Sequence, residues 1–192
     1  MRRLLYIVVP IALVVVVVIG LTQAGGGSDL GDGTDFDIAG AKRELSTAPA
    51  PLGGLYAQAN TLIGGGESAL NQRLDTLKGT PVVLNKWASW CGPCQAEFPV
   101  FQHAALAHGK TIAFLGINSG DKDPAAKKFL ATRPLPFPSY TDGDSKIAFA
   151  REIAAGFPMT QFIDRDGKVA FTHSGPYRSE DELTKDIERY LS

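Results

Sequence analysis

The stretch Trp90-Cys91-Gly92-Pro93-Cys94 contains the only two cysteines of this 192-residue chain. Two thiols separated by two residues can close into a disulfide with each other. A Cys-x-x-Cys pair at the start of a helix is the smallest unit that can pass a disulfide from one protein to another. The pair is therefore the first candidate for the chemistry of this chain.

The position of each cysteine predicts its task. A thiol at the amino terminus of a helix faces unpaired backbone N–H groups and the positive end of the helix dipole, which favour the thiolate. We expect Cys91 to be exposed and to attack a substrate disulfide. Cys94, one turn further and more enclosed, would then attack Cys91 and release the reduced substrate. Pro93 suits the first turn, where its missing N–H costs nothing.

A zinc site and a purely structural disulfide are the competing interpretations of the pair. Cys91, Cys94, His103 and His108 form a C-x2-C-x8-H-x4-H series. If residues 92–108 form one helix, Cys94 and His108 lie about 21 Å apart along it, too far for two ligands of one ion. A structural disulfide over so short a loop would stabilise little through chain entropy. We expect neither a metal nor another cofactor.

The formal charge of -1 gives no basic field for nucleic acid. The amino terminus is more informative, because Arg2 and Arg3 precede an uncharged apolar run over 4–21. As a helix this run would reach roughly 27 Å, close to the thickness of a bilayer core. The arginines favour a cytoplasmic amino terminus and an exported remainder.

A cleaved signal peptide is the other interpretation of this run, with Thr22-Gln23-Ala24 as a weak cleavage site. The run is longer than the usual apolar region of a signal peptide, about 7–15 residues. We predict a membrane anchor over 1–21, a flexible tether over 22–50 and one domain over 51–192. The tether prediction rests on the glycines and aspartates that follow residue 24.

The pattern within the domain alternates strands and helices. Residues 52–63 are weakly helical, and leucines at 70, 74 and 77 predict a helix over 67–77. Asp166-Gly167 predicts a hairpin turn, and the capping box Ser179–Glu182 begins a final helix that ends near Leu191. Further strands are expected over 81–84, 111–117, 137–140, 160–164 and 168–172, and further helices over 92–108, 123–131 and 145–153. This order predicts an α/β fold with a central mixed sheet covered by helices on both faces.

The segment Asn85–Pro99 resembles the active-site segment of thioredoxin-like proteins, and more closely that of the membrane-anchored, exported TlpA/ResA type. The resemblance covers roughly 67–192 and includes Gly156–Thr160, which is similar to a Gly-x-Pro-Thr-Thr segment of that family. It implies a thioredoxin-like fold. Asn85 stands where ordinary thioredoxins have a buried aspartate, as is usual in the TlpA/ResA type.

The resemblance also implies supporting roles for several residues. Pro158 would be the cis-proline opposite the cysteines, presenting backbone to a substrate, and a trans proline that opens a strand is the alternative. Glu97 would tune the thiols or assist proton transfer, and a solvated helix glutamate is the alternative. Trp90 is expected to pack around the motif and to offer an apolar docking face. His173 is expected to be a surface histidine without an acidic partner.

These observations predict an extracytoplasmic thiol–disulfide oxidoreductase that acts as a reductant. By resemblance, its substrates would be exported protein disulfides such as those of apocytochrome c or oxidase copper sites. A membrane electron donor of the CcdA or DsbD type would recharge it. A peroxiredoxin-like peroxide reductase and a non-catalytic binding module on the same fold are the alternatives. Residues 84–91 lack the proline and threonine of the usual peroxidase pattern.

Overall fold

The β-branched run after Gly79 forms the strand β2 (Val82–Trp87), which lies inside a six-stranded sheet. All six residues of β2 are buried in this computed structural model, which describes residues 33–192. A strand buried on both faces is apolar almost throughout, as the sequence predicted here. The charged exception is Lys86.

The sheet is mixed, as expected. Its strand order is β1-β4-β3-β2-β5-β6. Strands β1, β4, β3 and β2 pair in parallel, β5 pairs antiparallel with β2, and β6 pairs antiparallel with β5. The other five strands are β1 (Leu62–Ile63), β3 (Ala113–Ser119), β4 (Ser139–Asp142), β5 (Met159–Ile163) and β6 (Val169–Ser174). The prediction of a β-hairpin around Asp166-Gly167 is confirmed by β5 and β6.

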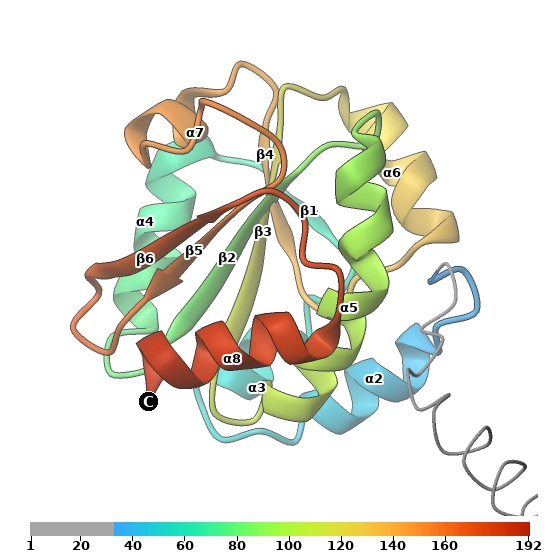
Figure 1. Ribbon diagram of the computed structural model, residues 1–192. Helices are drawn as coiled ribbons and strands as arrows, with labels where there is room; N and C mark the ends of the chain where they lie inside the picture. Colours follow the sequence, from blue (N-terminus) through green and yellow to red (C-terminus); the bar gives the residue numbers. More distant parts are fainter. Residues whose placement is uncertain (1–32) are drawn as a thin grey trace, which may run out of the picture. The chain divides into compact units, whose positions relative to one another are not determined.

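Helices cover both faces of this sheet (Figure 1). Helices α5 and α8 contact each other on one face, and α4 and α7 contact each other on the opposite face. The helices are α2 (Ile38–Leu45), α3 (Leu52–Tyr56), α4 (Gly66–Thr76), α5 (Gly92–His108), α6 (Asp123–Thr132), α7 (Lys146–Ala150) and α8 (Glu180–Leu191). The predicted long helix over 92–108 is confirmed by α5.

The expectation of a weak helix over 52–63 is correct only for its first turn. Helix α3 ends at Tyr56, and Leu62–Ile63 pairs with β4 at the edge of the sheet. Asn60, which lies between the two elements, has a φ of 61°. An asparagine tolerates this left-handed conformation better than most residues do, so the helix cannot continue through it.

The prediction of a flexible tether over 22–50 is wrong for the part that the structure describes. Helix α2 begins where the Asp37 carboxylate accepts a hydrogen bond from Gly40 N, and it buries Ala41 and Leu45. A Cβ on Gly109, at the end of α5, would lie 2.8 Å from Cδ2 of Leu45. The helix therefore packs against the end of α5, and the domain begins before residue 51.

The predicted anchor over 1–21 lies outside the described residues. Within residues 33–192, no helix is both long enough and apolar enough to cross a bilayer.

The packing of α2 leads to a stability prediction. Leu45 is fully buried, so Leu45→Ala should lower the free energy of unfolding by about 2–5 kcal/mol, because it removes apolar contacts and leaves a cavity. The exposed Arg43→Ala, on the same helix, should change it by less than about 0.5 kcal/mol. Denaturant unfolding of the two variants measures the difference. Equal stabilities would show that α2 is not docked on the domain.

Candidate functional site

Helix α5 begins at the cysteine pair. Cys91 is the N-cap residue of the helix, and its Sγ accepts a hydrogen bond from Cys94 N at 3.2 Å. The two sulfurs are joined in a disulfide, with a Cα–Cα distance of 5.3 Å. The structure therefore places a sulfur atom against the unpaired N–H groups of the first helical turn, which favour negative charge.

The two cysteines differ less in exposure than expected. Cys94 is fully buried, in agreement with the prediction, but Cys91 is only 4% exposed. The expectation of an exposed Cys91 is therefore wrong for this disulfide-bonded form, in which its sulfur is shared with Cys94. Pro93 lies in the first turn of α5, where the sequence placed it.

The loop before Cys91 is held by Asp121, a residue that the sequence analysis missed. The Asp121 carboxylate accepts hydrogen bonds from Ser89 N at 2.6 Å, Ser89 Oγ at 3.0 Å, Asn118 Nδ2 at 3.0 Å and Lys122 N at 2.8 Å. Burial alone would raise the pKa of this carboxyl, but the four hydrogen bonds outweigh burial and hold its pKa below the usual range. Asp121 is therefore a charged anchor for the active-site loop.

Trp90 lies on the surface beside the cysteine pair. Its side chain is 60% exposed, and its Nε1–H donates to the carbonyl of Gly120 at 3.0 Å. The indole meets the ring of Phe157 edge to face, with ring centroids 5.0 Å apart. This contact brings the segment that precedes the cysteines next to the segment that contains Pro158.

The peptide bond between Phe157 and Pro158 is cis, as the resemblance implied. Strand β5 begins at the next residue, Met159, and pairs with Lys86 of β2. The carbonyl of Pro158 accepts a hydrogen bond from Gly175 N, just after β6. The trans alternative is therefore wrong.

Glu97 is buried on the inner face of α5, so the alternative of a solvated helix glutamate is wrong. Its Oε1 accepts a hydrogen bond from Asn85 Nδ2 at 2.8 Å, and its Oε2 accepts one from Tyr177 N at 3.1 Å. Burial raises the pKa of Glu97 to about 8, although both hydrogen bonds oppose the shift. The carboxyl can therefore gain or lose a proton near neutral pH.

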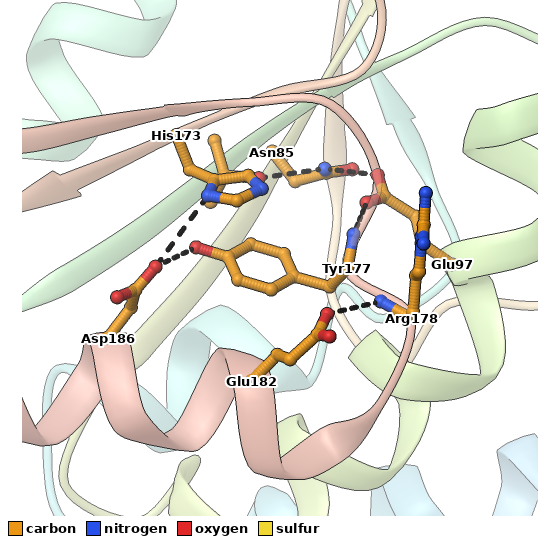
Figure 2. A network of polar contacts seen from close by, with 8 residues as sticks. Asn85, Glu97, His173, Tyr177, Arg178, Glu182 and Asp186 are labelled. Carbon is orange, nitrogen blue, oxygen red and sulfur yellow. Dashed lines mark hydrogen bonds and ion pairs between the residues drawn. The ribbon is translucent and has the colours of Figure 1, made fainter.

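Tyr177 joins Glu97 to a second polar group on α8 and β6. Figure 2 shows Glu97 near the backbone nitrogen of Tyr177 and Asp186 at its hydroxyl. The hydroxyl donates to Asp186 Oδ2 at 2.7 Å. His173 stacks on the Tyr177 ring, with centroids 4.1 Å apart, and its Nδ1 lies 3.7 Å from the same carboxylate oxygen. His173 thus has an acidic partner, contrary to our expectation.

The two histidines of the zinc alternative lie on α5, and the helix is continuous over 92–108, which was the premise of the geometric argument. Nε2 of His108 lies 3.4 Å from Oγ1 of Thr184 on α8, at the opposite end of α5 from the cysteines. Among residues 33–192, no cluster of three or more metal-binding side chains is present.

The chain is similar in sequence to known proteins. The redoxin family model matches residues 56–189. The thiol-disulfide oxidoreductase ResA of Geobacillus kaustophilus is 31% identical over 62% of this chain and 66% of its own, so the chain spans just under two thirds of that relative. The thiol:disulfide interchange protein HelX of Rhodobacter capsulatus is 31% identical over 79% of this chain and 84% of its own.

A solved structure with the same thioredoxin-like fold is that of a secreted Mycobacterium tuberculosis disulfide oxidoreductase homologous to E. coli DsbE. It is 29% identical, with a TM-score of 0.53, and the match covers 60% of this chain and 85% of that one. The predicted fold class of the domain, an α/β sheet with helices on both faces, is confirmed.

The raised pKa of Glu97 leads to a prediction for the oxidised protein. A carboxyl with a pKa of about 8 in the fold and about 4.5 when unfolded favours folding below pH 4.5, and this contribution is lost as the pH rises toward 8. Glu97→Gln cannot titrate, so its stability relative to wild type should rise between pH 5 and 8 by roughly 1.4 kcal/mol per pH unit at most. Denaturant unfolding over this range measures the difference.

The exposed Glu188→Gln on α8 is the matched control, because it removes a carboxyl without changing a buried one. Its stability relative to wild type should stay constant over the same range. A constant difference for Glu97→Gln as well would contradict the raised pKa of Glu97.

Proposed function

The chain belongs to the redoxin family, and we propose that it is an extracytoplasmic thiol–disulfide oxidoreductase that reduces disulfides of exported proteins. One observation carries this proposal: the disulfide between Cys91 and Cys94 lies at the first turn of α5, with a sulfur accepting a backbone hydrogen bond. The relatives named for thiol–disulfide oxidoreduction and interchange support the same chemistry.

The reaction follows from the two positions in the helix. In the reduced protein, the Cys91 thiolate attacks one sulfur of a substrate disulfide, and the other substrate sulfur leaves as a thiolate. Cys94 then loses its proton and attacks Sγ of Cys91, which breaks the mixed disulfide and releases the second substrate thiolate. The substrate gains two electrons and leaves as two thiolates, which take up one proton released by Cys94 and one from solvent, and the protein ends in the disulfide form that the structure shows.

Four further residues support this exchange in the proposal. Pro93 shapes the turn that brings Cys94 back to Cys91. Trp90 offers an exposed apolar surface beside the cysteines, and Pro158 lies in the neighbouring segment, where its backbone can face a bound substrate chain. Asp121 keeps the loop of Trp90 and Cys91 in place through its bonds to Ser89.

Glu97 acts in this proposal as the proton acceptor and donor for the buried thiol. Cys94 must lose a proton before it can attack, and it lies one helical turn before Glu97. A carboxyl with a pKa of about 8 can exchange protons with a thiol at little cost in free energy. Its bonds to Asn85 and Tyr177 hold it in one orientation.

The proposed setting is the outer face of a membrane. The apolar run over 4–21 would anchor the chain, and part of 22–32 would connect it to the domain. In an oxidising compartment the disulfide between Cys91 and Cys94 needs a source of electrons, which a membrane donor of the CcdA or DsbD type would supply. Disulfides of apocytochrome c or of oxidase copper sites are the proposed substrates.

Trapping tests the proposal. In the full chain, Cys94→Ser cannot resolve the mixed disulfide, so we expect Cys91 to hold its substrates in covalent complexes that dithiothreitol dissolves. With insulin as the probe, wild type should catalyse disulfide reduction by dithiothreitol. Cys91→Ser should reduce this rate to the uncatalysed background, because the attacking sulfur is gone.

The double variant Cys91→Ser/Cys94→Ser is the control, because it lacks the disulfide but keeps the fold's other contacts. Two results together would contradict the proposal and favour a binding module. These are the absence of trapped complexes in cells that carry Cys94→Ser, and a wild-type phenotype of cells that carry Cys91→Ser. Rapid consumption of hydrogen peroxide without insulin reduction would contradict it in favour of a peroxide reductase.

A further inference from the structure

A charged residue is buried within the central strand, five positions before the first cysteine. Side chains of a strand alternate between the two faces of a sheet. Asn85 contacts Glu97 of α5, so Lys86 points to the opposite face, where it lies against the segment after α7. Its exposure is only 1%. A buried lysine needs partners for its charge, and their identity indicates what the residue does.

The partners of Lys86 lie in the segment that leads to the cis-proline. Its Nζ donates to the carbonyl of Ile153 at 2.6 Å and lies 3.9 Å from the centroid of the Phe157 ring. Burial lowers the pKa of this amine, and the nearby carboxylate of Asp142 opposes that shift. The ammonium group thus fixes both ends of the 153–157 segment, one through a hydrogen bond and the other through a cation–π contact.

The contact continues from Phe157 to the surface. Besides its contact with Lys86, the Phe157 ring meets the Trp90 indole edge to face. The indole N–H donates a hydrogen bond to the carbonyl of Gly120. A Cβ added to Gly120 would lie 3.9 Å from Trp90 and 4.0 Å from Phe157, so both rings lie close to this glycine. Lys86 therefore contacts Phe157, and Phe157 contacts Trp90, so that an unbroken chain of contacts runs from the sheet to the exposed indole.

We propose that Lys86 is a positioning residue for substrate docking: it holds Phe157 against Trp90 and so sets the surface that receives a protein disulfide next to Cys91. This inference rests on the proposed oxidoreductase function and adds a residue that controls which disulfides are accepted. The partner it favours is an extended polypeptide that carries a disulfide, because such a partner covers both Trp90 and the segment of Pro158.

The charge of Lys86 is the essential property. A methionine has a similar length and fills the same space, but it can neither donate to the Ile153 carbonyl nor attract the face of the Phe157 ring. An arginine keeps the charge and can stack on an aromatic ring, although its geometry differs. Comparison of the two substitutions separates the charge from the volume.

Kinetics on the full chain test the inference. With insulin as the protein disulfide, Lys86→Met should raise KM about five-fold or more, the loss expected from one desolvated cation–π contact. The rise in KM of Lys86→Met for 5,5′-dithiobis(2-nitrobenzoic acid) should be smaller, because this reagent needs only an accessible thiolate. Lys86→Arg should recover part of the KM for insulin. Lys127→Met, on the exposed face of α6, is the control and should match wild type.

A spectroscopic measurement tests the same inference without activity. The chain has two tryptophans, so its indole N–H groups give two nuclear magnetic resonance signals, and Trp90→Phe identifies which belongs to Trp90. Lys86→Met should shift the Trp90 signal and leave that of Trp87, which is buried against Phe98, in place. Phe157→Leu should shift the Trp90 signal as well and raise KM for insulin, without a further increase in the double variant.

Unchanged KM for insulin and an unchanged Trp90 signal in Lys86→Met would overturn the inference. If Lys86→Met does not fold, Phe157→Leu decides, and wild-type values for both measurements would overturn the inference equally. Failure of the wild-type chain to reduce insulin would instead contradict the proposed function. In that case the Trp90 signal would still show whether Lys86 positions the indole.

Discussion

The amino terminus of α5 is the constraint on which the rest of the site depends. The Cys91 sulfur accepts the N–H of Cys94, so the helix offers its unpaired donors to the atom that would carry negative charge after reduction. A sulfur in such a position favours the thiolate, which in the proposed function makes Cys91 the attacking group. Cys94 is buried.

Segments far apart in the chain support this helix terminus. Asp121, just after β3, fixes the loop that precedes Cys91, and Phe157, just before β5, packs on Trp90 of that loop. Glu97 and Tyr177 join α5 to the segment before α8. In the proposed function the cysteines supply the chemistry and Glu97 of α5 exchanges the proton, while segments at the ends of strands form the surface around them.

Local features of the site were predictable from the sequence, and long-range ones were not. The cysteine motif and the long helix over 92–108 follow from short patterns, and the cis-proline was implied by the resemblance of Gly156–Thr160 to a family segment. The partners of Glu97, and of His173 with Asp186, depend on how α8 packs, which no local pattern shows. Lys86 could not be assigned because a lysine in an apolar strand pattern gives no sign of its partners. Helix α2 was missed because its neighbourhood is rich in glycine and aspartate.

The ionisation of Cys91 tests the central claim most directly. The reduced full chain should be alkylated with iodoacetamide across pH, with Cys94→Ser used to report Cys91 alone. The account predicts a reaction midpoint well below the value for free cysteine, about 8.5, because the helix terminus stabilises the thiolate. A midpoint at or above that value, with no exchange between this sulfur and a model disulfide, would contradict the account.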